Sequence, residues 1–230
     1  MREIDAIAAR CGGRDPEWMD EKRRCAVLVP FLERDGEMHV LFERRAGGIH
    51  QGGETCFPGG GAEPGESDTA CALRETEEEL GIPQSEIQVL GRSDFLLTPA
   101  GVRLQPVLGL LSPRATDFLS PSPAEVAEVF TVPLRFFQET EPEVYAYTQE
   151  PVVQPDFPFD AVGVPRDYRF ARGRIEVPVW HYGTHVIWGI TARILRSILR
   201  PPVNRPSGGQ ERSRPWILPS VPPGKGISPS

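Results

Sequence analysis

No long apolar run occurs in this 230-residue sequence, whereas a membrane-spanning helix needs roughly 18 consecutive apolar residues. A secretory signal is also missing, because charged residues interrupt the segment from Met1 to Asp15 before any apolar stretch can form. We therefore expect no membrane partner and a cytoplasmic location.

Cysteine is scarce, and the four cysteines form no Cys-x-x-Cys pair, which argues against a zinc knuckle and a disulfide framework. Clusters of lysine and arginine are absent too, and the net charge is -7. Without a basic patch we expect no nucleic-acid partner. A phosphate-bearing small molecule stays compatible with this charge, provided that carboxylates hold a bridging divalent cation.

Composition divides the sequence into three segments. Residues 1–22 form an N-terminal leader of helix and loop, with the helix expected at Ile4 to Ala9. Residues 23–200 have the length and composition of one globular domain. Residues 201–230 are dominated by Pro, Gly, Ser and Arg, so burial cannot offset their ordering entropy and we expect a disordered tail.

Within the domain, strand-like and helix-like runs alternate, and the Asp35-Gly36 pair predicts a hairpin turn. The expected strands are Cys25 to Leu32, Met38 to Glu43, Ile87 to Leu97, Val102 to Leu111, Phe130 to Leu134 and the extended run Arg174 to Trp188. The expected helices are Ser67 to Leu80, a short acidic one at Glu125 to Val129, and Ile187 to Leu199, with an excursion loop from Gln149 to Pro165. This mixture predicts an α+β domain of packed layers.

The helix expected at Ser67 to Leu80 carries an unusual concentration of carboxylates. Helical spacing places Glu75, Glu78 and Glu79 within about one third of the circumference, opposite the apolar face that contains Leu80. Like charges at this spacing destabilise a helix unless a cation lies among them, and hard cations such as Mg²⁺ prefer oxygen ligands. Taken alone, however, such a string is more typical of a solvated acidic face.

The preceding glycine-rich loop changes that interpretation. Gly60 is followed after five residues by Glu66, and after seven more by a string that begins at Arg74 and ends at Ile82. This string is Arg74-Glu75-Thr76-Glu77-Glu78-Glu79-Leu80-Gly81-Ile82. The spacing resembles the Nudix box, with Thr76 standing where a bulky aliphatic residue is usual. The resemblance implies a Nudix α/β/α sandwich with a mixed sheet, in which a loop-helix-loop motif carries the catalytic residues.

The resemblance also assigns roles to residues of the box. Glu75, Glu78 and Glu79 would bind Mg²⁺ or Mn²⁺, and Glu78 or Glu79 would also help to deprotonate a metal-held water. Arg74 would orient the glutamates, and Glu66 would be a secondary ligand or a loop anchor. The backbone of the preceding glycines, Gly59 and Gly60, would approach the substrate closely.

A second motif precedes the box. The segments Leu41 to Ala46 and Gly53 to Gly60 resemble the upstream motif of coenzyme A diphosphatases in the Nudix family, except that Ile49 or His50 stands where a second arginine is usual. Glu125 to Leu134 and Ile187 to Leu195 are similar to that subfamily as well. The substrate-binding residues implied are Arg45, His50, Gly53, Phe57, Gly59 and Gly60.

The function expected is the hydrolysis of coenzyme A, or a derivative, to adenosine 3',5'-diphosphate and 4'-phosphopantetheine or its acyl form. One alternative keeps the chemistry and changes the substrate to ADP-ribose or a dinucleotide. Another is a Nudix fold that only binds its ligand, which is disfavoured because all three box glutamates are present. The sequence leaves the choice between a monomer and a homodimer open.

Other residues have simpler structural interpretations. His181 and His185 lack the glutamate of His-Glu-x-x-His and lie in an extended segment, so a zinc protease site is not expected. Aromatic residues near them, among them Trp180 and Trp188, fit packing better than adenine stacking. A pair of acids at Glu125 and Glu128 fits a solvated helix face better than an extra metal ligand.

Overall fold

The computed structural model describes residues 3–12, 18–48 and 51–200. The chain divides into two units, Met1–Leu199 and Arg200–Ser230, and only Arg200 of the second belongs to the described residues. The tail expected at 201–230 and the site residue His50 therefore lie outside them. Helix α1 (Glu3–Cys11) contains the short helix expected at Ile4 to Ala9.

The domain begins with the expected hairpin. Strands β1 (Arg23–Arg34) and β2 (Glu37–Arg45) are antiparallel, and the turn residues Asp35 and Gly36 have φ angles of 54° and 78°. Positive φ at both central residues is what a two-residue hairpin needs, and Asp and Gly tolerate it. The prediction of this turn from the Asp-Gly pair is confirmed.

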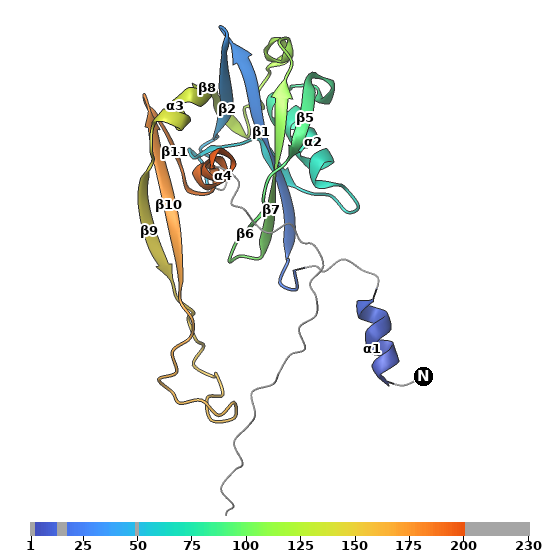
Figure 1. The fold of residues 1–230 in the computed structure, drawn as a ribbon, viewed down its shortest axis with the longest axis vertical. Helices are drawn as coiled ribbons and strands as arrows, with labels where there is room; N and C mark the ends of the chain where they lie inside the picture. The colour runs from blue at the N-terminus through green and yellow to red at the C-terminus, as the bar shows by residue number, and fades with distance from the viewer. Residues whose placement is uncertain (1–2, 13–17, 49–50, 201–230) are drawn as a thin grey trace, which may run out of the picture. The chain divides into compact units, whose positions relative to one another are not determined.

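These strands start a mixed sheet in the order β3-β2-β1-β7-β5, with further pairs β4 to β1, β6 to β7 and β8 to β2 (Figure 1). Strand β1 runs parallel to β7, whereas the other pairs in this sheet are antiparallel. The remaining strands of the sheet are β3 (Thr55–Cys56), β4 (Gly59–Gly61), β5 (Ile87–Arg92), β6 (Leu96–Leu97), β7 (Val102–Leu111) and β8 (Val126–Pro133).

Strand β1 changes neighbours along its length. Its end, Phe31 to Arg34, pairs with β2, whereas Cys25 to Val27 pair with β4. Strand β3 pairs with Glu43 and Arg44, near the C-terminal end of β2, whereas β4 pairs with β1. The chain between β3 and β4 therefore bends from β2 to β1. The glycine-rich segment at this bend is thereby held within the sheet, beside the start of β1.

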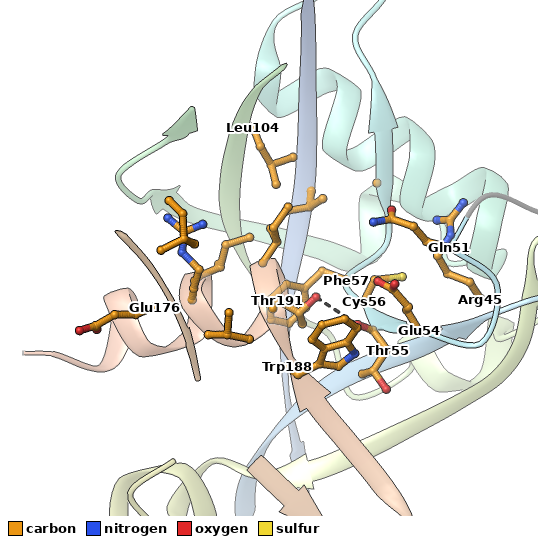
Figure 2. A pocket seen from close by; sticks show the side chains of 18 of the residues that line it. Arg45, Gln51, Glu54, Thr55, Cys56, Phe57, Leu104, Glu176, Trp188 and Thr191 are labelled. Atoms are coloured by element: carbon orange, nitrogen blue, oxygen red, sulfur yellow. Dashed lines mark hydrogen bonds between the residues drawn. The ribbon is translucent and has the colours of Figure 1, made fainter. Parts of the chain in front are cut away.

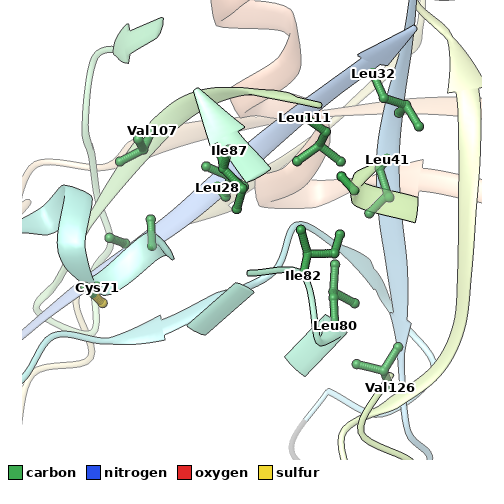
Figure 3. Close-up of a cluster of buried hydrophobic side chains, with 13 residues drawn as sticks. Leu28, Leu32, Leu41, Cys71, Leu80, Ile82, Ile87, Val107, Leu111 and Val126 are labelled. Carbon is green, nitrogen blue, oxygen red and sulfur yellow. The ribbon is translucent and has the colours of Figure 1, made fainter. Parts of the chain in front are cut away.

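Helix α2 (Asp68–Leu80) packs on one face of the sheet, against β1, β4 and β7. Figure 3 shows the buried cluster beneath it, in which Leu80 and Ile82 lie near side chains of the sheet. A short helix η1 (Gln84–Glu86) follows α2, and another, η2 (Ala115–Phe118), follows β7.

The opposite face is covered by a second cluster that includes side chains of α4 (Gly189–Leu199) and of a three-stranded sheet in the order β11-β10-β9. The strands of this sheet are β9 (Glu143–Gln149), β10 (Gly173–Tyr182) and β11 (His185–Trp188), and α3 (Leu134–Glu139) precedes it. Figure 1 shows α2 and α4 on opposite sides of the main sheet. The expected α+β fold with helices on both faces is confirmed.

One expected element is wrong, and one strand was not expected. The short helix expected at Glu125 to Val129 is wrong, because Val126–Pro133 form strand β8 against β2. Its valines at positions 126, 129 and 132 favour a strand, and pairing with β2 outweighs the helical spacing of the two acids. Strand β9 was not foreseen, since nearly all of its side chains are exposed and its stability comes from pairing with β10.

Candidate active site

Helix α2 begins and ends with local signals. The Ser67 side chain accepts a hydrogen bond from the Ala70 N–H at 3.1 Å, and Gly81, with φ 74°, donates its N–H to Glu77 O at 2.9 Å. These contacts satisfy backbone groups that a helix end would otherwise leave free. Thr76 is fully buried, but its hydroxyl donates to Ala72 O at 2.7 Å, so the polar residue in this apolar position has a partner.

Arg74 is the centre of an ion-pair network on this helix. Its guanidinium donates to Glu66 at 2.9 and 3.1 Å, to Glu75 at 2.9 Å and to Glu78 at 3.0 Å. It also donates to Gly61 O at 3.1 Å, which ties the helix to β4. The bond from Arg74 lowers the pKa of Glu66 to about 2, and the same bond raises the pKa of Arg74. The geometry fits the orienting role expected of Arg74 and the anchoring role expected of Glu66.

Glu79 is buried, at 6% exposed, and one carboxylate oxygen accepts the Gly59 N–H at 2.7 Å. Burial, and after it the negative charge of Glu43, raise the pKa of Glu79 to about 8. Gly59 has φ 150°, and a Cβ there would lie 2.3 Å from Ala26 O. Only glycine fits this approach, which places the turn directly over the Glu79 carboxylate.

The next glycine explains the position of a second box glutamate. A Cβ on Gly60 would lie 2.5 Å from the Glu75 carboxyl group, so the Glu75 side chain fills the space that a larger residue would need. Burial raises the pKa of Glu75, while Arg74 opposes this shift. Glu78 is more open, with 56% of its side chain exposed. The structure thus brings Gly59, Gly60, Glu75 and Glu79 together at the bend between β3 and β4.

A further carboxylate, Glu43 of β2, joins this group, and the sequence analysis did not single it out. It is only 1% exposed, and one oxygen accepts the Cys56 thiol hydrogen at 3.2 Å, while its Oε2 has no hydrogen-bond partner in the described part of the chain. Burial raises the pKa of Glu43 to about 7. The sequence signal that could have indicated this residue is a glutamate directly after the apolar run Val40-Leu41-Phe42.

Whether these residues fit a divalent cation can be judged from their chemistry. Among the described residues, no three His, Cys, Asp or Glu side chains already converge as a finished metal set. Carboxylates are nevertheless concentrated where burial disfavours their charge, and Glu43 Oε2 is buried without a hydrogen-bond partner among the described residues. Such groups are normally paired or bound to metals, and oxygen ligands suit Mg²⁺ and Mn²⁺. The donor set therefore fits the expected cofactor.

A cavity of about 370 Å³ lies beside this bend and reaches to α4. Figure 2 shows Arg45, Phe57 and Trp188 around it, and a hydrogen bond of 3.1 Å from Thr191 to Thr55 O joins α4 to β3. Gly59 and Arg193 also line this cavity, so it extends from the glycine whose N–H binds Glu79 to an arginine of α4.

The other expected substrate residues have different surroundings. Phe57 is 3% exposed and stacks on Phe42 with ring centroids 5.1 Å apart, so it also belongs to the core. Gly53 has φ 84° and donates its N–H to Arg45 O at 3.0 Å, which closes the turn between β2 and β3. Gly53 is not among the residues that line the cavity.

The downstream residues match their simpler interpretations only in part, because Glu128 lies on strand β8 and not on a solvated helix face. His181 and His185 lie in strands β10 and β11. Glu128 pairs with His185 and with Arg44, each at 3.0 Å, and these contacts lower the pKa of Glu128. Trp180 is buried and donates to a backbone oxygen, whereas Trp188 is 42% exposed at the rim of the cavity.

Among residues 3–12, 18–48 and 51–200, no helix is long and apolar enough to cross a membrane. Figure 2 shows Thr55, Cys56 and Phe57 beside the cavity, and a few residues further along the chain Gly59 and Gly60 contact Glu79 and Glu75 of α2.

Residues 22–150 match the NUDIX domain. The chain is 32% identical over 182 residues to the human mitochondrial coenzyme A diphosphatase NUDT8, covering 76% of this chain and 67% of that protein. It is 34% identical over 180 residues to the uncharacterized Nudix hydrolase NudL of Photorhabdus laumondii, covering 78% and 84%. The mouse peroxisomal coenzyme A diphosphatase NUDT7 is 36% identical over 126 residues, covering 54% of this chain and 52% of that protein.

Among solved structures, the Nudix hydrolase RenU of M. smegmatis is similar with a TM-score of 0.44 and 22% identity, over 56% of this chain and 80% of that one. The domain match covers more than half of the sequence and includes the whole glutamate-bearing helix. The chain therefore belongs to the Nudix family and is a hydrolase that acts on diphosphate linkages.

Proposed function

We propose that this Nudix hydrolase cleaves the diphosphate bond of coenzyme A or its derivatives, giving adenosine 3',5'-diphosphate and 4'-phosphopantetheine or its acyl form. The observation that carries the proposal is the cavity, which joins the glycine turn over Glu79 to a wall of apolar and cationic side chains. The diphosphatases NUDT8 and NUDT7 among the relatives support the same substrate class.

In this proposal the carboxylates of Glu75, Glu78 and Glu79 hold the divalent cation. A bound Mg²⁺ or Mn²⁺ supplies positive charge to the diphosphate and lowers the pKa of water. Glu78 or Glu79 accepts a proton from the water whose oxygen attacks phosphorus, and the bond from phosphorus to the bridging oxygen breaks. Arg74 keeps the glutamates oriented, because its guanidinium already contacts Glu75 and Glu78.

Two arginines of the cavity suit the extra phosphate that distinguishes coenzyme A from ADP-ribose. Arg45 occupies the position of the first arginine in the upstream motif of coenzyme A diphosphatases. Arg45 and Arg193 of α4 line the same cavity. Arg193 makes no hydrogen bond or ion pair with the described part of the chain, so its guanidinium is available for an anion. It supplies a second guanidinium to the cavity, while the upstream motif of this sequence lacks its usual second arginine.

The first experiment is product analysis by mass spectrometry. Purified full-length protein is incubated with coenzyme A, its 3'-dephospho form, ADP-ribose or NADH, with Mg²⁺ or Mn²⁺ and with a chelator. We expect the highest kcat/KM for coenzyme A or an acyl derivative, and no turnover with the chelator. A clear preference for ADP-ribose or the dinucleotide would contradict the substrate proposal while leaving the diphosphatase chemistry intact.

A second prediction concerns the 3'-phosphate. Arg45→Ala or Arg193→Ala should raise KM for coenzyme A about 10- to 100-fold, because a charged hydrogen bond contributes about 1.5–3 kcal/mol. The change for 3'-dephospho coenzyme A should be much smaller for whichever arginine contacts that phosphate. Arg44→Ala is the matched control, since Arg44 pairs with Glu128. Equal losses on both substrates would exclude the phosphate contact.

A further inference from the structure

Glu43 lies outside the Nudix box, yet it faces the same side of the sheet as the box helix. Along β2, Val40 and Phe42 pack in the cluster beneath α4, whereas Leu41 packs in the cluster beneath α2. Side chains alternate between the faces of a strand, so Glu43 lies on the Leu41 side. Its neighbours in the sheet are Cys56 of β3 and Val129 of β8.

Glu43 is linked to Glu79 through the glycine-rich turn. Its Oε1 accepts the hydrogen of the Cys56 thiol, and the chain runs from Cys56 to Gly59, whose N–H binds Glu79. Both carboxylates are buried, with Glu43 1% and Glu79 6% exposed, and each is bound by one end of the short segment from Cys56 to Gly59. Two buried negative charges in one place are costly without a cation between them.

The second carboxylate oxygen of Glu43, Oε2, faces no hydrogen-bond donor among the described residues. Only 1% of the Glu43 surface is exposed, so solvent does not reach this oxygen, and no group in the part of the chain that the structure describes donates to it. Arg45, two residues further along β2, lowers the pKa of Glu43, but burial outweighs this influence. A buried carboxylate oxygen of this kind needs an ion or a water to satisfy it.

We propose that Glu43 is an additional carboxylate of the cation site, using its Oε2 to hold the hydrated divalent ion together with Glu79. This inference rests on the proposed function, because it assumes that the box glutamates bind the cation. Mg²⁺ and Mn²⁺ take oxygen ligands, and Mg²⁺ in particular keeps several of its waters, so Glu43 can serve the ion directly or through one of these waters. Cys56 then acts as the positioning residue that fixes the other oxygen of Glu43.

The test uses Mn²⁺ alone as the probe, followed by electron paramagnetic resonance or calorimetry on the full chain without substrate. Glu43→Gln keeps the shape of the side chain and removes its charge. We expect the Kd for Mn²⁺ to rise about 10- to 100-fold, as for other residues that support a metal site. Glu33→Gln is the matched control, because Glu33 is an exposed glutamate of the same hairpin, and its Kd should equal that of the wild type.

Thermal unfolding separates this role from a purely structural one. Without metal, Glu43→Gln should melt at the wild-type temperature or above it, because a costly buried charge is gone. With Mn²⁺, its melting temperature should rise less than that of the wild type. A metal-free variant that is destabilised but binds Mn²⁺ normally would overturn the inference. If Glu43→Gln does not fold, Glu43→Asp keeps the charge at shorter reach, and unchanged Mn²⁺ affinity in that variant would overturn it equally.

The outcomes also separate this inference from the substrate proposal. A wild type that binds no Mn²⁺ would defeat both the metal-dependent function and the role of Glu43. A wild type that binds Mn²⁺ just as Glu43→Gln does would defeat the role of Glu43 alone. Mn²⁺ binding that depends on Glu43, in a protein that does not cleave coenzyme A, would support the inference and defeat only the choice of substrate.

Discussion

Glu79→Gln is expected to reduce kcat for coenzyme A by about 100-fold or more, because in the proposed mechanism Glu79 helps to bind the cation and to accept a proton, and the change removes its charge. Folding should change little, since the amide oxygen of Gln can still accept the Gly59 N–H that Glu79 accepts at 2.7 Å. Glu78→Gln should produce a similar loss in kcat, although its side chain is 56% exposed. Steady-state kinetics and thermal unfolding measure the two effects separately.

Glu77→Gln provides the control on the same helix. Glu77 is exposed and accepts a hydrogen bond from Gln84 at 2.9 Å, away from the Arg74 network. Its kcat should stay within a factor of about two of the wild type, as is usual for surface changes far from a site. Near-normal turnover in both Glu78→Gln and Glu79→Gln would contradict the assignment of the box glutamates, whatever the substrate.

Local sequence signals predicted the elements that carry the site. The helix expected at Ser67 to Leu80 and the hairpin turn expected at Asp35-Gly36 both form, because caps and turns depend on nearby residues and on the φ angles that these residues tolerate. The orienting role that the Nudix-box resemblance implies for Arg74 fits its contact with Glu78 at 3.0 Å, four residues further along the helix. The bidentate contact to Glu66 was not foreseen, since it depends on the path of the loop.

Features that depend on pairing between distant segments were not predictable in the same way. Glu43 acquires its place because β3 and β8 pair with β2 and bury it, and a strand sequence does not reveal its neighbours. Arg193 lines the cavity because α4 packs beside β3, which lies far from it in the sequence. The helix wrongly expected at Glu125 to Val129 has the same origin, since pairing with β2 decides its conformation.

The three glycines of β4 should respond very differently to replacement by alanine, although the chemical change is the same. A Cβ on Gly59 would lie 2.3 Å from a backbone oxygen of β1, and its φ of 150° is unfavourable for alanine. This variant should be destabilised and unfold at a lower temperature. On Gly61 the Cβ would meet only the end of the flexible Arg23 side chain, at 2.8 Å, so Gly61→Ala should behave nearly as the wild type.

Gly60→Ala should lose activity while keeping most of its stability, because its Cβ would lie 2.5 Å from the carboxyl group of Glu75 and not against backbone. The Glu75 side chain must then move, and displacement of a catalytic group by about 1 Å can reduce the rate about 100-fold. We expect a loss of that order in kcat/KM, with weaker Mn²⁺ binding and a melting temperature close to that of Gly61→Ala. If Gly60→Ala retains full activity and Mn²⁺ affinity, the position of Glu75 beneath this glycine is not needed for catalysis. If it unfolds as readily as Gly59→Ala, its role is to maintain the β4 backbone instead.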